Sequence, residues 1–283
     1  MVNYNIEINN AKTRFIRTND GGTPTIKEIP TSSFLSVMEG EDIVLPENTR
    51  IYKKISHEKY IFVTEQEPMF RTIKIEIGLT YRWRQFHKWC KENEVTDGPD
   101  YFRDKFKATT FSYRENPYHF HVLTPYMVYI TMLWNCGGWT TRLKVFCNNK
   151  PITSKKEQLY VAPFFNLHGT GSVCAGYNIY EDIKELPPSP TQAVTLMNGS
   201  FWRTTFNRDY PGHIRKYKDI PEYSNYFIWE YLSKFNPAKL MSLKLVPHTT
   251  LDTIIDLTQR SLVSTSQSKN IKRISQFFPS VKF

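Results

Sequence analysis

The chain has 283 residues, of which 40% are hydrophobic and 15% are aromatic, and its formal net charge is +10. This composition is typical of a folded globular protein and excludes a disordered or fibrous chain, while the length allows roughly two domains. The positive charge is compatible with binding nucleic acid or an acidic protein, but it selects neither.

No segment of the sequence predicts a membrane span, a secretory signal or a zinc site. The longest uncharged apolar run, about Leu123 to Cys136, is shorter than the roughly 18–20 residues that a span requires. The N-terminus has no basic segment followed by an apolar stretch. Cys90, Cys136, Cys147 and Cys174 form no Cys-x-x-Cys pair. We therefore expect reduced thiols, a cytoplasmic protein and no bound metal.

The first part of the chain predicts a small β-rich region. Residues 1–30 are polar, contain Gly21-Gly22 and indicate a loosely held lead-in. Between residues 43 and 77, short runs rich in Ile, Val, Tyr and Phe alternate with turn residues, which favours an antiparallel meander.

A helix with a basic outer face is expected after this meander. Apolar residues recur there at helical spacing, with basic residues elsewhere on the wheel. The apolar positions are Leu79, Trp83, Phe86 and Cys90, and the basic ones are Arg82, Arg84, Lys88 and Lys91. The segment that follows is rich in turn residues, so we place a domain boundary within residues 95–117.

The second half predicts strands, then a loop, then helices. The strands are expected at residues 126–134, 142–146 and 158–164, with Gly137-Gly138 in a hairpin turn. Helices are expected from Ser189-Pro190, over residues 223–235, and from Thr249-Thr250. This order indicates an α+β fold.

The loop between the strands and the helices reads "APFFNLHGTGSVCAGYN", residues 162–178. Gly169 and Gly171 allow tight turns, and their backbone N–H groups are candidates to face the thiol of Cys174. The carboxamide of Asn166 is a candidate donor to an oxyanion formed during acyl transfer. These residues suit the exchange of a thioester.

The spacing of Asn166, Gly171 and Cys174 resembles the active-site stretch of ubiquitin-conjugating enzymes, in which an Asn lies eight residues before the thioester-forming Cys. The resemblance implies that Cys174 carries a modifier and that Asn166 stabilises the oxyanion when an amine attacks. One departure is that Phe164-Phe165 stands where those enzymes usually have His-Pro.

The wider pattern resembles the PRTRC system protein B family of bacterial plasmids, also described as prokaryotic ubiquitin-conjugating-like family D. The likeness lies in residues 158–177, in "FWRTTFN" at 201–207 and in "LVPHTTLDTII" at 245–255. It implies a ubiquitin-conjugating-like domain at 118–260. The residue pattern adds a β-rich N-terminal domain with a basic aromatic helix at 1–117 and a basic flexible tail at 261–283.

The same resemblance implies partner proteins. These are a ThiF-like activating enzyme that consumes ATP, a small ubiquitin-like modifier and a JAB-type metallopeptidase that removes the modifier. The chain would then be a cysteine transferase that needs no cofactor of its own.

Several alternatives remain open at this stage. One is an inactive scaffold of the same fold, and another is a basic nucleic-acid-binding accessory protein of a plasmid or phage that uses the helix at 81–91. His168, between Asn166 and Cys174, is a candidate proton carrier in catalysis. His119-x-His121 is a candidate metal half-site, for which the sequence offers no third ligand.

Overall fold

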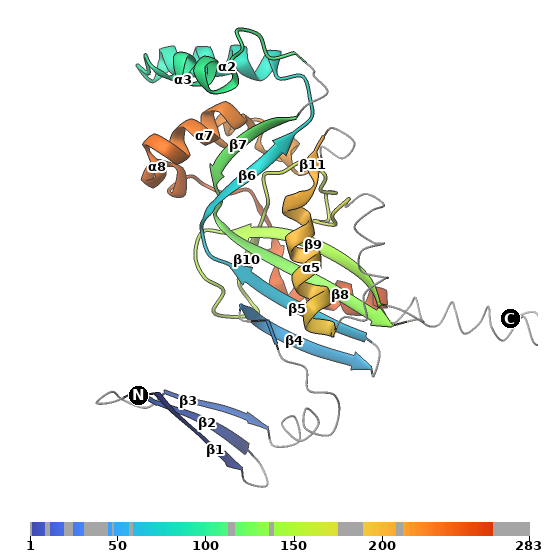
Figure 1. Cartoon of the computed structure of the whole chain (residues 1–283). Helices are drawn as coiled ribbons and strands as arrows, with labels where there is room; N and C mark the ends of the chain where they lie inside the picture. Colours follow the sequence, from blue (N-terminus) through green and yellow to red (C-terminus); the bar gives the residue numbers. More distant parts are fainter. Residues whose placement is uncertain are drawn as a thin grey trace, which may run out of the picture. The chain divides into compact units, whose positions relative to one another are not determined.

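The computed structural model of the chain divides into two units, Met1–Leu45 and Pro46–Phe283, and each is described by itself (Figure 1). The structure describes residues 2–8, 12–19, 25–30, 45–46, 48–56, 59–112, 117–135, 139–174, 189–207 and 212–262.

The first unit contains a three-stranded antiparallel sheet in the order β1-β2-β3. Its strands are β1 (Val2–Ile8), β2 (Lys12–Asn19) and β3 (Thr25–Pro30). The segment at residues 1–30, expected as a loosely held lead-in, thus contains three paired strands. The sequence "VNYNIEI" of β1 alternates apolar and polar residues, which is the period of a strand with two unlike faces.

The second unit is built on a six-stranded antiparallel sheet in the order β12-β10-β9-β8-β5-β4. The strands are β4 (Thr49–Ser56), β5 (Lys59–Gln66), β8 (Tyr126–Asn135), β9 (Trp139–Asn148), β10 (Gln158–Val161) and β12 (Pro247–Thr250).

A smaller sheet and several helices complete this unit. In the order β11-β6-β7, β6 (Phe70–Ile75) pairs antiparallel with β7 (Tyr118–Leu123) and parallel with β11 (Thr205–Phe206). The helices are α2 (Thr80–Glu92), α3 (Gly98–Phe106), α5 (Pro190–Arg203), η1 (Ile214–Tyr217), α6 (Pro221–Ser224), α7 (Tyr226–Phe235) and α8 (Pro237–Met241), and residues 251–262 are also helical.

The central strands of the six-stranded sheet are buried on both faces, as β8 illustrates. Met127 and Tyr129 lie in the larger apolar cluster, which also includes residues of α2, α5 and α7. Val128 and Ile130 lie in a second cluster with apolar residues of the helix at 251–262. Successive side chains of a strand point to opposite faces, so the continuous apolar run of β8 serves two cores.

The sequence predicts a domain boundary between residues 117 and 118. Strands from the two sides of this boundary pair with each other. β5 pairs with β8 from Lys59↔Trp134 to Gln66↔Met127, and β6 pairs with β7. The contacts place a division at residues 45 and 46 instead. The domain limits 1–117 and 118–260 stay a prediction, and these pairings do not favour them.

The helix signals of the sequence are confirmed in part. α5 begins as expected, because the Ser189 side chain accepts from the Gln192 backbone N–H at 3.3 Å and the Gln192 side chain accepts from the Ser189 backbone N–H at 3.1 Å. The helix expected at 223–235 is divided into α6 and α7, since Asn225 caps a new start with its side chain at 3.1 Å from the Phe227 nitrogen. α3 was missed because its segment is rich in turn residues.

Two expectations lie outside the described residues: the Gly137-Gly138 turn and most of the basic tail, residues 263–283. Within the described ranges, no helix has both the length and the apolar character that crossing a membrane demands.

Candidate functional site

The segment from Asn166 to Cys174 forms a short β-hairpin, which residues 162–165 join to the end of β10. The Cys174 backbone N–H donates to the Asn166 carbonyl oxygen at 2.8 Å, and the His168 N–H donates to the Ser172 carbonyl oxygen at 2.9 Å. At the tip, the Gly171 N–H donates to the His168 carbonyl oxygen at 2.8 Å. The hairpin therefore brings Asn166 and Cys174 opposite each other at its open end.

Gly171 fixes the shape of the tip. Its φ is +81°, in the left-handed region that glycine adopts without steric cost. A Cβ atom at this position would also overlap the ring of Phe146 on β9. The glycine that the sequence pattern singles out is thus required by the turn and by close packing.

The returning strand of the hairpin extends the main sheet. The Val145 N–H donates to the Gly171 carbonyl oxygen at 2.9 Å, and the Val173 N–H donates to the Leu143 carbonyl oxygen at 3.0 Å. β10 pairs with β9 only at Cys147 and Phe146, so the hairpin takes over the same edge of β9 where β10 ends. Cys174 therefore follows directly on a segment fixed to the sheet.

Two side chains, one from β12 and one from β9, contact backbone carbonyl groups at the hairpin tip. The His248 Nε2 atom of β12 lies 3.1 Å from the Gly169 carbonyl oxygen, and the Lys144 Nζ atom of β9 donates to the Thr170 carbonyl oxygen at 3.4 Å. His213 is fully buried, with its ring centroid 6.3 Å from that of His248. Burial lowers the pKa of His213 to about 4, so it is neutral near pH 7.

Cys174 is the one partly exposed thiol among the cysteines in the described ranges. Cys90 and Cys147 are buried, and all three are free. Burial raises the pKa of Cys90 to about 12, with a contribution from the nearby Asp97, and burial also raises the pKa of Cys147. Because the thiolate is the nucleophile, Cys90 and Cys147 are unsuited to chemistry near pH 7.

The side chain of Asn166 is committed to the fold. Its Nδ2 atom donates to the Thr205 carbonyl oxygen of β11 at 2.9 Å, and its Oδ1 atom accepts from the Asn207 backbone N–H at 3.3 Å. Asn166 is 6% exposed and has a φ of +59°. Since a carboxamide nitrogen carries two hydrogens, one donor remains after the bond to Thr205.

Phe164 and Phe165, which stand in place of His-Pro, pack into the core. Phe164 contacts Trp202 at a centroid distance of 5.3 Å and Trp229 at 5.2 Å. The Arg82 guanidinium of α2 lies over the ring of Phe165, with its Cζ atom 5.3 Å from the ring centroid. Aromatic packing, in place of the interactions of a His-Pro pair, thus positions the start of the hairpin.

A family model of the prokaryotic E2 family D matches residues 102–248. The matched segment is more than half of the chain and includes the whole hairpin, α5 and the first two residues of β12. The chain belongs to prokaryotic E2 family D. Comparisons with curated proteins and with solved structures give no match.

Membership of prokaryotic E2 family D confirms the family that the sequence resembles and indicates a ubiquitin-conjugating-like function. Such a function in general involves an E1-like activating enzyme and a ubiquitin-like protein. The mixed α+β architecture, with its curved antiparallel sheet, is consistent with this family. The chemical roles of Cys174, Asn166 and His168 stay predictions.

The hairpin corrects one expectation about this family D chain. The Gly171 N–H is used inside the turn, and Gly169 lies at the tip, at the opposite end of the hairpin from Cys174. At a strand rise of about 3.3 Å per residue, Gly171 is about 10 Å along the chain from Cys174. These amides are therefore not placed as donors beside the thiol. His168 is exposed, as expected for a loop histidine.

Sequence reasoning missed His248 as a site residue, although it lies in the "LVPHTT" stretch that carries the family resemblance. The proposed metal half-site gains no support. His119 and His121 lie on the exposed face of β7, and in the part of the chain that the structure describes no three His, Cys, Asp or Glu side chains gather to hold a metal ion.

The basic face of α2 is also partly used inside the fold. Arg82 Nε donates to the Ser224 carbonyl oxygen at 3.1 Å, and its backbone oxygen accepts from Asn225 Nδ2 at 2.7 Å. Lys88 lies 3.6 Å from Glu92. Of the four basic residues, Arg82 therefore has a structural role, which weakens the nucleic-acid interpretation of this helix.

The exposure of the thiols leads to a prediction that needs no partner protein. Brief treatment of the native chain with iodoacetamide at about pH 8 is expected to alkylate Cys174 well before Cys90 and Cys147. Peptide mass spectrometry measures each site separately, and the unfolded chain in denaturant, where all sites should react, is the control. Equal labelling of Cys147 and Cys174 in the native chain would contradict the burial described above.

Proposed function

We propose that the chain accepts a small ubiquitin-like modifier as a thioester on Cys174 and transfers it to an acceptor nucleophile. The observation that carries this proposal is the placement of a partly exposed thiol at the open end of a hairpin, opposite Asn166, inside the family D segment. The strands β8 to β10 lead into this hairpin and α5 follows it along the chain, which supports a ubiquitin-conjugating-like fold for this part.

The proposed reaction has two acyl transfers. In the first, the Cys174 thiolate attacks the carbonyl carbon of a thioester on the activating enzyme; the new carbon–sulfur bond forms as the old one breaks, and the partner's sulfur leaves as a thiolate that takes a proton. In the second, an acceptor amine attacks the Cys174 thioester, and the Cys174 sulfur leaves while the amine loses a proton. ATP is consumed only by the activating partner.

Each transfer passes through a tetrahedral oxyanion, which needs a hydrogen-bond donor. The remaining hydrogen on Asn166 Nδ2 is the donor that we assign to it. The bonds of this carboxamide to Thr205 and Asn207 hold it in one orientation, which is the preorganisation that such a donor requires. His168 is proposed as the proton carrier for the attacking amine.

We propose a ThiF-like enzyme as the activating partner, since this is the E1-like class that the family resemblance implies. The acceptor is an amine or another nucleophile. The free thiol that this chemistry requires fits a reaction in the reducing cytoplasm.

The test is a loading assay on the full chain. Incubation with a ThiF-like activating enzyme and its ubiquitin-like modifier, together with ATP, is expected to give an adduct that a thiol reductant removes. Mass spectrometry of the adduct should place the modifier on the peptide that contains Cys174. The absence of an adduct, with both partners active in forming their own thioester, would favour the inactive scaffold.

The role of Asn166 is tested separately from its structural bonds. In Asn166→Ala, backbone groups of the half-buried Thr205 and Asn207 lose their partner, so we expect a loss of about 1–3 kcal/mol in the free energy of unfolding. Discharge of the preformed thioester to free lysine is expected to slow about 100-fold or more in the folded protein. Denaturant unfolding and single-turnover discharge measure the two effects.

Ser172→Ala, on the same hairpin, is the matched control and should leave both quantities almost unchanged. A loss of stability in Asn166→Ala with an unchanged discharge rate would show that Asn166 only holds the fold.

A further inference from the structure

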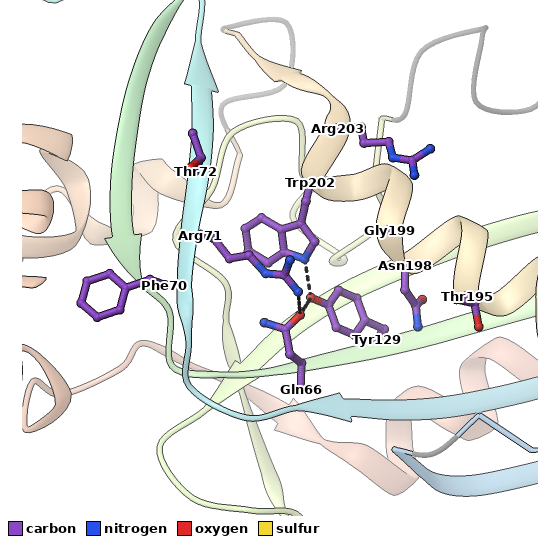
Figure 2. A pocket seen from close by; sticks show the side chains of 10 residues that line it. All are labelled: Gln66, Phe70, Arg71, Thr72, Tyr129, Thr195, Asn198, Gly199, Trp202 and Arg203. Atoms are coloured by element: carbon purple, nitrogen blue, oxygen red, sulfur yellow. Dashed lines mark hydrogen bonds between the residues drawn. The ribbon is translucent and has the colours of Figure 1, made fainter. Parts of the chain in front are cut away.

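A pocket of about 680 Å³ lies between α5 and the strands β5, β6 and β8, and none of its lining residues belongs to the hairpin at 166–174 (Figure 2). Its volume is in the range of small-molecule sites. The lining residues are Gln66, Phe70, Arg71, Thr72, Tyr129, Thr195, Asn198, Gly199, Trp202 and Arg203.

The pocket contains an ordered polar network. The Arg71 guanidinium lies over the indole of Trp202, 5.4 Å from its ring centroid, and Arg71 Nη2 donates to Gln66 Oε1 at 2.7 Å. Trp202 Nε1 donates to the Tyr129 hydroxyl at 2.8 Å, and that hydroxyl donates to Gln66 Oε1 at 3.1 Å (Figure 2). Two donors therefore converge on Gln66 Oε1 and orient its amide.

Two donor groups of these network residues have no acceptor among the described residues. Gln66 Nε2 and Arg71 Nε are buried, and neither has a partner among the described residues. Since most buried polar groups in folded proteins are paired, two unpaired donors beside one cavity indicate a missing acceptor.

The charged residues that line the pocket are positive, which also favours an anionic ligand. Arg71 and Arg203 line it, no lining residue is acidic, and no carboxylate of the described chain forms an ion pair with Arg71. Arg71 is half-buried, so its charge has lost part of its hydration. A guanidinium in such a place favours a bidentate oxyanion.

We propose that this pocket binds a small organic anion whose carboxylate or phosphate group lies against Arg71 and Gln66. With a small adjustment of these side chains, the oxygens of the anion supply the acceptors that Gln66 Nε2 and Arg71 Nε lack. A bare inorganic anion would fill only a small part of the pocket, so its remaining volume, along Asn198 and Thr195 of α5, accommodates the organic part of the ligand.

The pocket is independent of the proposed thioester chemistry, because it contains none of Cys174, Asn166 and His168. Binding and modifier loading can thus fail separately. The pocket and that site are in contact through packing, because Trp202 of the pocket packs on Phe164 at the start of the hairpin, with 5.3 Å between their ring centroids.

The test is a titration of the full chain with three probes: inorganic phosphate, acetate and adenosine monophosphate, each at constant ionic strength against sodium chloride. The readout is the indole N–H resonance of Trp202 in proton–nitrogen NMR spectra, assigned by its loss in Trp202→Phe. We expect a saturable shift with at least one probe and none with chloride. Comparison of phosphate with acetate distinguishes a phosphate from a carboxylate ligand, and adenosine monophosphate tests the organic part.

Two variants test the residues. Arg71→Gln removes the cation, while Gln66→Glu places a carboxylate beside Arg71 that competes with the ligand; each should weaken binding about 10- to 100-fold. Arg84→Gln, an exposed arginine on α2 that does not line the pocket, is the matched control and should bind as the native chain does. If Arg71→Gln does not fold, Gln66→Glu decides alone.

The proposal is overturned if no probe gives a saturable shift, if chloride gives the same shift, or if binding is unchanged in Gln66→Glu.

Discussion

Cys174→Ala is expected to abolish the reductant-sensitive adduct with the modifier completely, because no other cysteine in the described ranges is placed to form the proposed thioester. Among the described cysteines, Cys90 and Cys147 are buried and their thiols have raised pKa values. The substitution removes a small, partly exposed side chain, so the stability of the fold should change by less than about 0.5 kcal/mol. Non-reducing gel electrophoresis and thermal unfolding measure the two results.

Cys174→Ser sharpens this test, since a serine oxygen that accepted the modifier would give an ester that reductant does not remove. Ser172→Ala retains the thiol and is the control for changes in the hairpin itself. An adduct that persists in Cys174→Ala would show that a different residue carries the modifier.

Glu230→Ala is expected to lower the free energy of unfolding by about 3–5 kcal/mol, because it leaves the charge of Lys105, whose side chain is only 17% exposed, without its partner. Glu230 of α7 is 1% exposed and lies 2.5 Å from Lys105 Nζ of α3. Its carboxylate also accepts from the Tyr101 hydroxyl at 2.7 Å and from the His121 backbone N–H at 3.0 Å. One side chain thus links α7 to α3 and β7.

Denaturant unfolding measures this loss, and Asp104→Ala, an exposed carboxylate on α3, is the matched control. The double variant Lys105→Met with Glu230→Leu should recover part of the loss, since it removes both charges, while the Tyr101 hydroxyl and the His121 N–H still lack their acceptor. A loss below about 1 kcal/mol in Glu230→Ala would mean that water reaches Lys105 easily.

This network matters for the site because α7 also supports the start of the hairpin. Trp229, next to Glu230, packs on Phe164, and Tyr226 lies 6.0 Å from Phe165 between ring centroids. The two phenylalanines that distinguish this chain from the usual His-Pro pattern are thus anchored by an aromatic core. Changes in α7 are therefore expected to affect the hairpin through packing.

Local features of the structure could be predicted from the sequence. Trp83, Phe86 and Cys90 are buried on α2 as their helical spacing predicts, and Ser189 caps α5 as its residue type predicts. These features depend on neighbours three or four positions away, whose chemistry is written in one short segment. The strands of the first unit carried a similar signal in the alternation of β1, which the polar composition of residues 1–30 obscured.

The arrangement of the site was decided by tertiary structure. The spacing of Asn166, Gly171 and Cys174 indicated a thiol loop, but only the fold shows that Asn166 bonds to β11 and that His248 lies against Gly169. The same holds for the pocket at Arg71, whose residues come from β5, β6, β8 and α5. Contacts between residues tens of positions apart depend on which strands pair and which faces pack, and no local period or cap encodes that choice.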